Sequence, residues 1–131
     1  MQHVTPPPTP QLPIIQRFIS AYKAWHEFLP HVPKDSRYSL GIKIDRLLVE
    51  TLELLYSASY AKPEQKSLHL EKATTRLDLV KFFLQVLWEI KALDNKKYIT
   101  LSENFNELGK QLGGWMRQAN KAKENPARAG K

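Results

Sequence analysis

A chain of 131 residues, 42% of them hydrophobic, is long enough to bury one hydrophobic core, which excludes wholesale disorder. It has no cysteine, which excludes disulfides, thiolate metal sites and cysteine nucleophiles, and its net charge of +7 favours polyanionic partners. No apolar run approaches the roughly 18 residues of a membrane span and the N-terminus lacks the order of a secretory signal, so we expect a cytoplasmic protein with no membrane partner.

Proline is concentrated at the start of the chain, which predicts an extended, flexible leader over residues 1–13. A first helix is expected over residues 13–29. Its apolar side chains recur every three or four residues on one face: Ile15, Phe18, Tyr22, Trp25 and Leu29. A second helix is expected over residues 39–61. Ser39 is its predicted N-cap, because a serine hydroxyl accepts the free N–H groups of a first helical turn.

A third helix is expected over residues 65–93, since Asp94 and Asn95 favour a turn. The fourth is expected over residues 96–122, where apolar residues alternate at spacings of three and four, as in the seam of a left-handed bundle. The seam consists of Tyr98, Leu101, Phe105, Leu108, Leu112 and Trp115. Trp115, the last of these, is interpreted as a core residue, with base stacking as the alternative. Residues 124–131 predict a basic, flexible tail.

Short links join the second, third and fourth helices, so neighbouring helices are expected to run antiparallel. The predicted fold class is all-α: an up-down-up-down antiparallel four-helix bundle over residues 14–123. The polar positions of the second and third helices each form a line one residue wide, which leaves more apolar surface than one bundle buries. A second copy of the chain would cover that surface, so we expect a homo-oligomer. In the alternative, a monomer, Phe82, Phe83 and Trp88 enlarge the core.

Glycines interrupt the fourth helix, where each costs about 1 kcal/mol relative to alanine. Gly109 and Gly113 lie four residues apart on one side of it. Because a glycine has no side chain, we expect this pair to let the backbone of a neighbouring helix approach closely. A leucine in place of Gly113 is then expected to break helix packing or assembly.

Motifs for catalysis or metal binding are missing from the sequence. None of the four histidines belongs to an H-E-x-x-H or Glu-x-x-His motif, and without cysteine a zinc site would need carboxylates from separate helices. Glu50 shares a polar stripe with Glu53 and follows Arg46 by four residues, which indicates a surface ion pair rather than a catalytic pair. Nucleophile elbows and Gly-rich phosphate loops are absent. We expect no catalytic residue, no metal and no cofactor.

Basic residues are concentrated in the fourth helix and beyond it. Lys110, Arg117 and Lys121 fall on one side of that helix, at spacings of seven and four, and Lys123 continues the charge towards the tail. Lys34 and Arg37 add positive charge before the second helix. This arrangement predicts phosphate binding. The alternative is a surface that only keeps the protein in solution.

Three segments, in this order, resemble the accessory variability determinant (Avd) family of diversity-generating retroelements. They are PKDSRYSLGIKIDRLLVETLELLYSASY at 33–60, LEKATTRLDLVKFFLQVLWEIKAL at 70–93 and ITLSENFNELGKQLGGWMRQANK at 99–121. The resemblance covers about residues 14–123. Four-helix proteins encoded within intervening sequences of bacterial 23S rRNA genes share the PK..RY.LG pattern at the start of the first segment. The Leu-Gly-Gly-Trp at 112–115 favours Avd.

The resemblance implies a homopentameric ring of four-helix bundles with a basic surface. It also implies a non-enzymatic role: binding a reverse transcriptase and its template RNA or cDNA in mutagenic retrohoming. The expected nucleic-acid contacts, placed by charge, are Arg17, Lys34, Arg37, Lys110, Arg117, Lys121 and Lys123. The Pro-rich leader has no recognisable counterpart in the family. Two alternatives remain: the 23S rRNA-associated type of protein, and a structural helical oligomer that binds protein and has no nucleic-acid role.

Overall fold

The computed structural model describes residues 12–124, and four long helices make up most of them. These are α1 (Pro13–Phe28), α3 (Ile42–Tyr60), α4 (Pro63–Glu89) and α5 (Asn95–Glu124). Between α1 and α3 the chain forms a 3-10 turn, η1 (Leu29–His31), a short helix, α2 (Lys34–Ser36), and a π-helical turn, η2 (Arg37–Gly41). No strand occurs within residues 12–124, so the all-α prediction is confirmed. Most of the predicted leader and all of residues 125–131 of the predicted tail lie outside the described residues.

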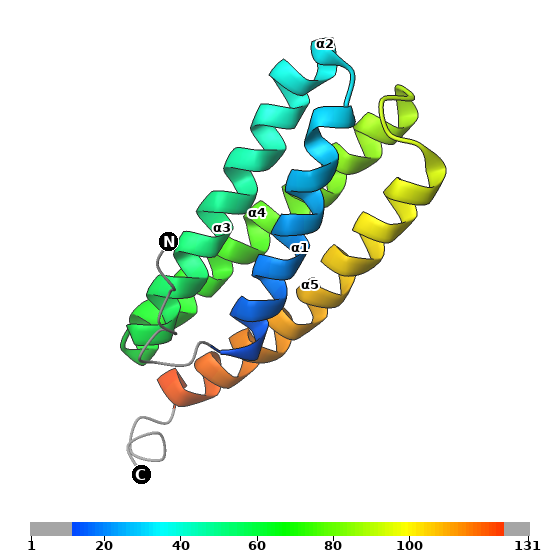
Figure 1. The fold of residues 1–131 in the computed structure, drawn as a ribbon. Helices are drawn as coiled ribbons and strands as arrows, with labels where there is room; N and C mark the ends of the chain where they lie inside the picture. The colour runs from blue at the N-terminus through cyan, green and yellow to red at the C-terminus, as the bar shows by residue number, and fades with distance from the viewer. Residues whose placement is uncertain (1–11, 125–131) are drawn as a thin grey trace, which may run out of the picture.

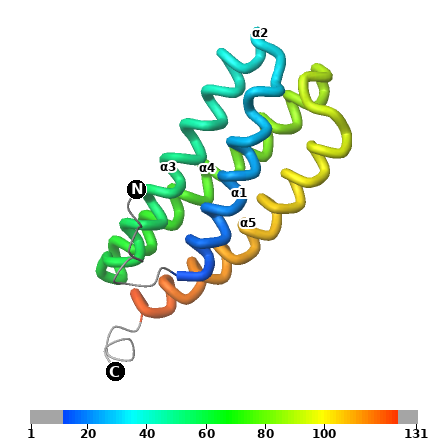
Figure 2. Tube along the Cα trace, in the orientation of Figure 1, coloured from blue at the N-terminus to red at the C-terminus, as the bar shows by residue number. Residues whose placement is uncertain are grey.

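Successive long helices run in opposite directions and form one four-helix bundle (Figure 1). α3 packs on α4 and α4 on α5, while α1 closes the bundle by packing on both α3 and α5. α1 and α4 therefore lie on opposite sides of the bundle. The antiparallel order also brings the beginning of α1 next to the end of α5 (Figure 2).

The core runs the full length of the bundle. Phe18 of α1 meets Phe105 of α5, with ring centroids 6.3 Å apart, and both side chains are buried. The seam predicted for the last helix is buried at Leu101, Phe105, Leu108 and Leu112. Tyr98 and Trp115, at its two ends, are only partly buried.

The prediction that the second helix begins at Ser39 is wrong. The chain is helical from Lys34, through the π-helical turn η2, into α3. Ser39 lies inside this run, and its hydroxyl donates to the carbonyl oxygens of Asp35 (3.1 Å) and Ser36 (3.3 Å) instead of capping a helix. A π turn has no composition signal of its own, which is why the sequence placed the boundary five residues late.

The third helix also differs from its predicted range of 65–93. It begins at Pro63, where the fixed φ of proline suits the first helical position. It ends at Glu89 in a Schellman motif: the Ala92 N–H donates to the Leu87 carbonyl (2.8 Å) and the Lys91 N–H to the Trp88 carbonyl (3.0 Å). Lys91 occupies the left-handed position with φ of 64°, where glycine is usual. Because position 91 is not a glycine, the usual sequence signal for a helix end is absent here, and the predicted end came too late.

The last helix starts at Asn95 and continues to Glu124, slightly longer than the predicted 96–122. The backbone N–H of Lys97 donates to Asp94 Oδ1 (2.8 Å), so Asp94 caps the first turn. This hydrogen bond holds the pKa of the Asp94 carboxyl below its ordinary value.

Several large apolar side chains remain exposed on the outer sides of α3 and α4. Of the three aromatic residues that enlarge the core in the monomer alternative, Phe82 (55%) and Trp88 (38%) are exposed, whereas Phe83 is partly buried and packs against the core. The other exposed ones on these two helices are Ile42, Val49, Tyr56, Tyr60, Leu68 and Leu79. No helix within residues 12–124 is long and apolar enough to cross a membrane.

A polar contact joins α1 to α3 at the edge of the core. Both the Tyr22 hydroxyl (2.8 Å) and the Trp25 indole N–H (3.2 Å) donate to Asp45 Oδ1. Burial, followed by the hydrogen bond to Asp45 and the charge of that carboxylate, raises the pKa of Tyr22 to about 12. Tyr22 therefore keeps its proton in the folded protein at a pH where an unfolded tyrosine, with a pKa near 10, loses it.

We expect this difference to make stability depend on pH above about 10. The contribution of the raised pKa is complete below the unfolded value and is lost as the pH rises towards about 12. In an ultraviolet titration of the folded protein, one phenolate should appear late, and Tyr22→Phe should remove this late phase. Asp45→Asn should bring it to lower pH without returning it to 10, because burial, the largest cause, remains. A wild-type titration without a late phase would contradict the assignment.

Candidate nucleic-acid interface

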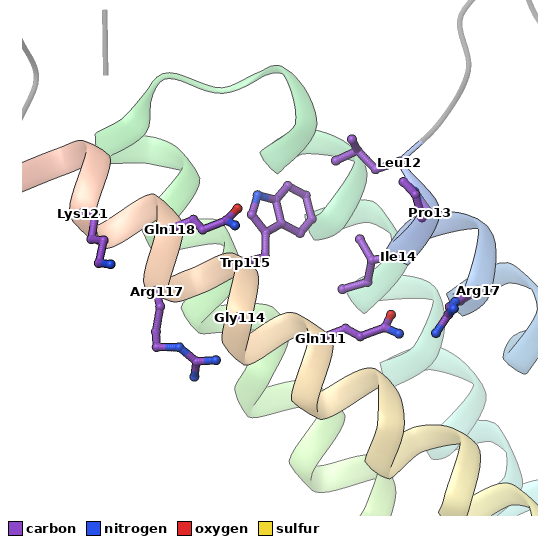
Figure 3. Close-up of a pocket in the computed structure, with 10 residues that line it drawn as sticks. All are labelled: Leu12, Pro13, Ile14, Arg17, Gln111, Gly114, Trp115, Arg117, Gln118 and Lys121. Carbon is purple, nitrogen blue, oxygen red and sulfur yellow. The ribbon is translucent and has the colours of Figure 1, made fainter. Parts of the chain in front are cut away.

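A hollow of about 670 Å³ lies where the first turn of α1 meets the last turns of α5 (Figure 3). α1 contributes side chains from its beginning, and α5 contributes side chains from Gln111 onward. Ten of the described residues line it: Leu12, Pro13, Ile14, Arg17, Gln111, Gly114, Trp115, Arg117, Gln118 and Lys121. Three of them are cations and none is acidic, so the lining suits an anion.

The cations lie on two sides of the hollow. Arg17 projects from α1 on one side, and Arg117 and Lys121 project from α5 on the other (Figure 3). All three are exposed, and no acidic side chain within residues 12–124 forms an ion pair with any of them. Glu107 shares a smaller neighbouring hollow with Arg17. Guanidinium groups hold phosphate oxygens with paired N–H donors, so an uncompensated set of this kind fits a phosphate backbone.

The Arg117 guanidinium lies over the two adjacent glycines of α5, at a distance where a Cβ atom would make only ordinary contact. A Cβ atom at Gly113 would lie 3.7 Å from Arg117 Nη1, and one at Gly114 would lie 3.7 Å from Nη2. The guanidinium therefore lies along bare helix backbone. No other helix of the described chain comes within 4 Å of a Cβ at Gly113, so the close-approach interpretation is wrong for Gly113 within one chain. At Gly109 a side-chain atom of α4 comes near instead: Lys81 Nζ would lie 3.3 Å from the added Cβ.

Trp115 lies between the core and the hollow. It packs in part against the buried cluster, and it also lines the hollow beside Ile14 and Gln118 (Figure 3). Trp115 is the last residue of the helical seam, so one side of it contacts the core and the other faces open space. The prediction that Trp115 is a core residue is therefore only partly confirmed. The two glutamines, Gln111 and Gln118, were not singled out from the sequence, since amides on a helix carry no spacing signal.

The other predicted contacts lie elsewhere. Lys110 is exposed on α5, seven residues or roughly 10 Å along the axis from Arg117. Lys123 is exposed near the end of the same helix. Lys34 and Arg37 lie far from the hollow, at the end of the bundle where α2 and η2 connect α1 to α3 (Figure 1). The hollow therefore gathers only Arg17, Arg117 and Lys121 from the predicted set.

Lys34 and Arg37 form a second group of cations around an exposed aromatic ring. Lys34 Nζ lies 6.0 Å and Arg37 Cζ 5.6 Å from the centroid of the Tyr38 ring, which is 62% exposed. Arg37 Nε is buried and has no hydrogen-bond partner among the described residues. No spacing signal in the sequence marks Tyr38 as part of this group.

The carboxylates form ion pairs on the surface. Glu50 pairs with Arg76 of α4, with Arg76 Nε 3.0 Å from Glu50 Oε1, and not with Arg46 as its spacing predicted. The pair joins α3 to α4 and leaves Glu50 outside any catalytic arrangement. Residues 12–124 contain no group of three or more His, Asp or Glu side chains that could hold a metal ion.

Comparison with known families identifies the family of this chain. A family model described as bAvd-like matches residues 12–119, which take in most of the four-helix bundle and nine of the ten residues that line the hollow. No curated protein matches the chain.

Proposed function

Because the chain belongs to the bAvd-like family, we propose that it is a non-enzymatic accessory protein of a diversity-generating retroelement. In this role it acts in the cytoplasm, binds the reverse transcriptase of the element and its template RNA or cDNA, and supports mutagenic retrohoming. Family membership supports the accessory role. The partners and their contacts are part of the proposal.

The observation that carries nucleic-acid binding is the uncompensated charge of the hollow. Arg17, Arg117 and Lys121 line one concave surface, and no acidic residue among residues 12–124 lines it. Three cations scattered on a surface would only raise solubility, but cations from two helices that line one hollow can contact successive phosphates of the same strand. Lys110 and Lys123 extend this surface along α5, and Lys34 and Arg37 provide a separate contact at the far end.

Assembly into a homo-oligomeric ring is part of the same proposal, with five copies as the resemblance implies. The exposed apolar side chains of α3 and α4 support it, since surface of this kind is usually covered in a stable protein. A ring would also repeat the hollow around one assembly. Several weak phosphate contacts would then act together on one RNA.

Binding of structured RNA at several salt concentrations tests the proposal. Wild-type protein is compared with a variant that carries Arg17→Glu, Arg117→Glu and Lys121→Glu. Each phosphate contact with single-stranded nucleic acid contributes about 0.7 to the slope of log affinity against log salt. The variant should therefore bind much more weakly, with a slope shallower by about 2.

The matched control carries Lys43→Glu, Lys62→Glu and Lys72→Glu, which change the net charge equally at exposed positions outside the hollow. It should retain most of the affinity and the slope. Equal losses in both variants would mean that the hollow acts only through the overall charge of the protein and is not a specific binding site. A wild-type protein that binds no RNA but retains the reverse transcriptase in a pull-down would leave the protein-binding oligomer as the function.

A further inference from the structure

We infer that the hollow accepts an unpaired base, so that this end of the protein prefers single-stranded nucleic acid to duplex; the inference rests on the proposed function. Phosphate binding needs only cations. The hollow offers more: Trp115, an apolar side formed by Leu12, Pro13 and Ile14, and two amide side chains. Trp115 and the apolar side offer nothing to a phosphate and fit the faces of a nucleotide base, and the two amides can hydrogen-bond the polar atoms at its edge.

The aromatic ring is the first element of this fit. Trp115 is partly buried and lines the hollow together with cations and no acidic side chain among the described residues, whereas the hollow beside Trp88 also has Glu89 and Asp94 in its lining. Trp25 is fully buried, and Trp88 stacks on Tyr98 with ring centroids 5.0 Å apart. An indole beside open space provides a stacking surface for any base.

The arrangement of polar groups is the second element. Gln111 and Gln118 lie on the same side of α5 as Trp115, and each amide can both donate and accept a hydrogen bond (Figure 3). Arg17 lies beside this centre on α1, whereas Arg117 and Lys121 leave α5 on the side away from Trp115 (Figure 3). A base at the centre would therefore have Arg17 for a neighbouring phosphate, and Arg117 and Lys121 would meet the strand where it continues across α5.

The missing side chain of Gly114 is the third element. Gly114 lies between the aromatic and the cationic sides, where a Cβ would meet only Arg117 Nη2. A base in a duplex is already stacked and paired, so its faces are not free to contact Trp115.

The test uses tryptophan fluorescence in a Trp88→Phe background, where Trp115 is the responsive tryptophan because Trp25 is fully buried. Three ligands are titrated: a short oligothymidylate, an abasic strand of the same length and a duplex. Oligothymidylate should quench the fluorescence and bind about 5- to 150-fold more tightly than the abasic strand, which corresponds to the usual gain from one stacked base. The abasic strand and the duplex should bind with the salt dependence of phosphate contacts and without quenching.

A second variant, Trp115→Leu, should lose the preference for oligothymidylate over the abasic strand while its far-ultraviolet circular dichroism remains that of the wild type. If this variant does not fold, the quenching experiment still decides, because it leaves Trp115 in place. Equal, unquenched binding of all three ligands would overturn base insertion and leave phosphate binding by the hollow intact. Quenching by the duplex as strong as by the single strand would also overturn it. Failure of all three ligands to bind would remove both the inference and the nucleic-acid-binding part of the proposed function.

Discussion

Leu87→Ala is expected to lower the free energy of unfolding by about 2–5 kcal/mol. The Leu87 side chain is completely buried, so its removal loses transfer free energy and leaves a cavity that the tightly packed bundle fills only in part. The residue also lies where α4 ends. Its carbonyl accepts the Ala92 N–H of the Schellman motif, and both side chains are buried there. A cavity at this point loosens the core and the turn that leads into α5.

Denaturant unfolding followed by circular dichroism measures this loss at one fixed protein concentration, because the stability of an oligomer depends on concentration. Ile19→Ala is the matched control. It deletes the same number of carbon atoms, but Ile19 is 37% exposed on α1, outside the apolar surfaces of α3 and α4, and we expect a loss of about 1 kcal/mol or less. Equal losses in the two variants would mean that Leu87 does not lie in the core.

The number of long helices and the face that each turns towards the core could be predicted from the sequence, because the spacing of hydrophobic residues reflects which of them are buried. Leu101, Phe105, Leu108 and Leu112 keep the spacing of a bundle seam, and all four are buried. The boundaries failed where backbone geometry departs from the usual residue signals. Lys91 holds a left-handed position without being glycine, and η2 is a π turn that continues a helix through Ser39.

Only the part of the candidate site that lies on α5 could be placed together from the sequence. Arg117 and Lys121 share a face of α5 because they are four residues apart, and that much is periodicity. Arg17 joins them only because α1 and α5 are antiparallel and in contact, which local patterns do not encode. Trp115 has the spacing of a core residue. Its contact with the hollow depends on where α1 begins, and that is a tertiary feature.

The variant Leu79→Glu with Phe82→Glu is expected to separate the proposed ring into single chains of 15.2 kDa. Both side chains are exposed on α4, where two buried carboxylates in an interface would be strongly unfavourable. A closed ring needs two different surfaces on each chain, since each copy contacts its two neighbours differently. The apolar residues of α4 provide one surface, and Ile42, Val49 and Tyr56, spaced seven apart on α3, provide the other.

Light scattering at micromolar concentration measures the mass. Wild-type protein should give a multiple of 15.2 kDa, five-fold for a pentamer. The control, Gln65→Glu with Thr75→Glu, adds the same two negative charges at exposed polar positions of α4 and should keep the wild-type mass. A wild-type mass of one chain would refute the ring, and an unchanged mass in the Leu79 and Phe82 variant would place the interface elsewhere.

The same variant separates assembly from binding. The hollow lies between α1 and α5, while α4 lies on the opposite side of the bundle from α1, so the single chain should keep its hollow intact. Its affinity for a short oligonucleotide that fills one hollow should equal that of the wild type. For a long RNA the affinity should fall by about 10²-fold or more, because contacts that act together in a ring become independent when the ring is lost. Equal affinities for the long RNA would mean that each chain binds alone, whatever the mass of the assembly.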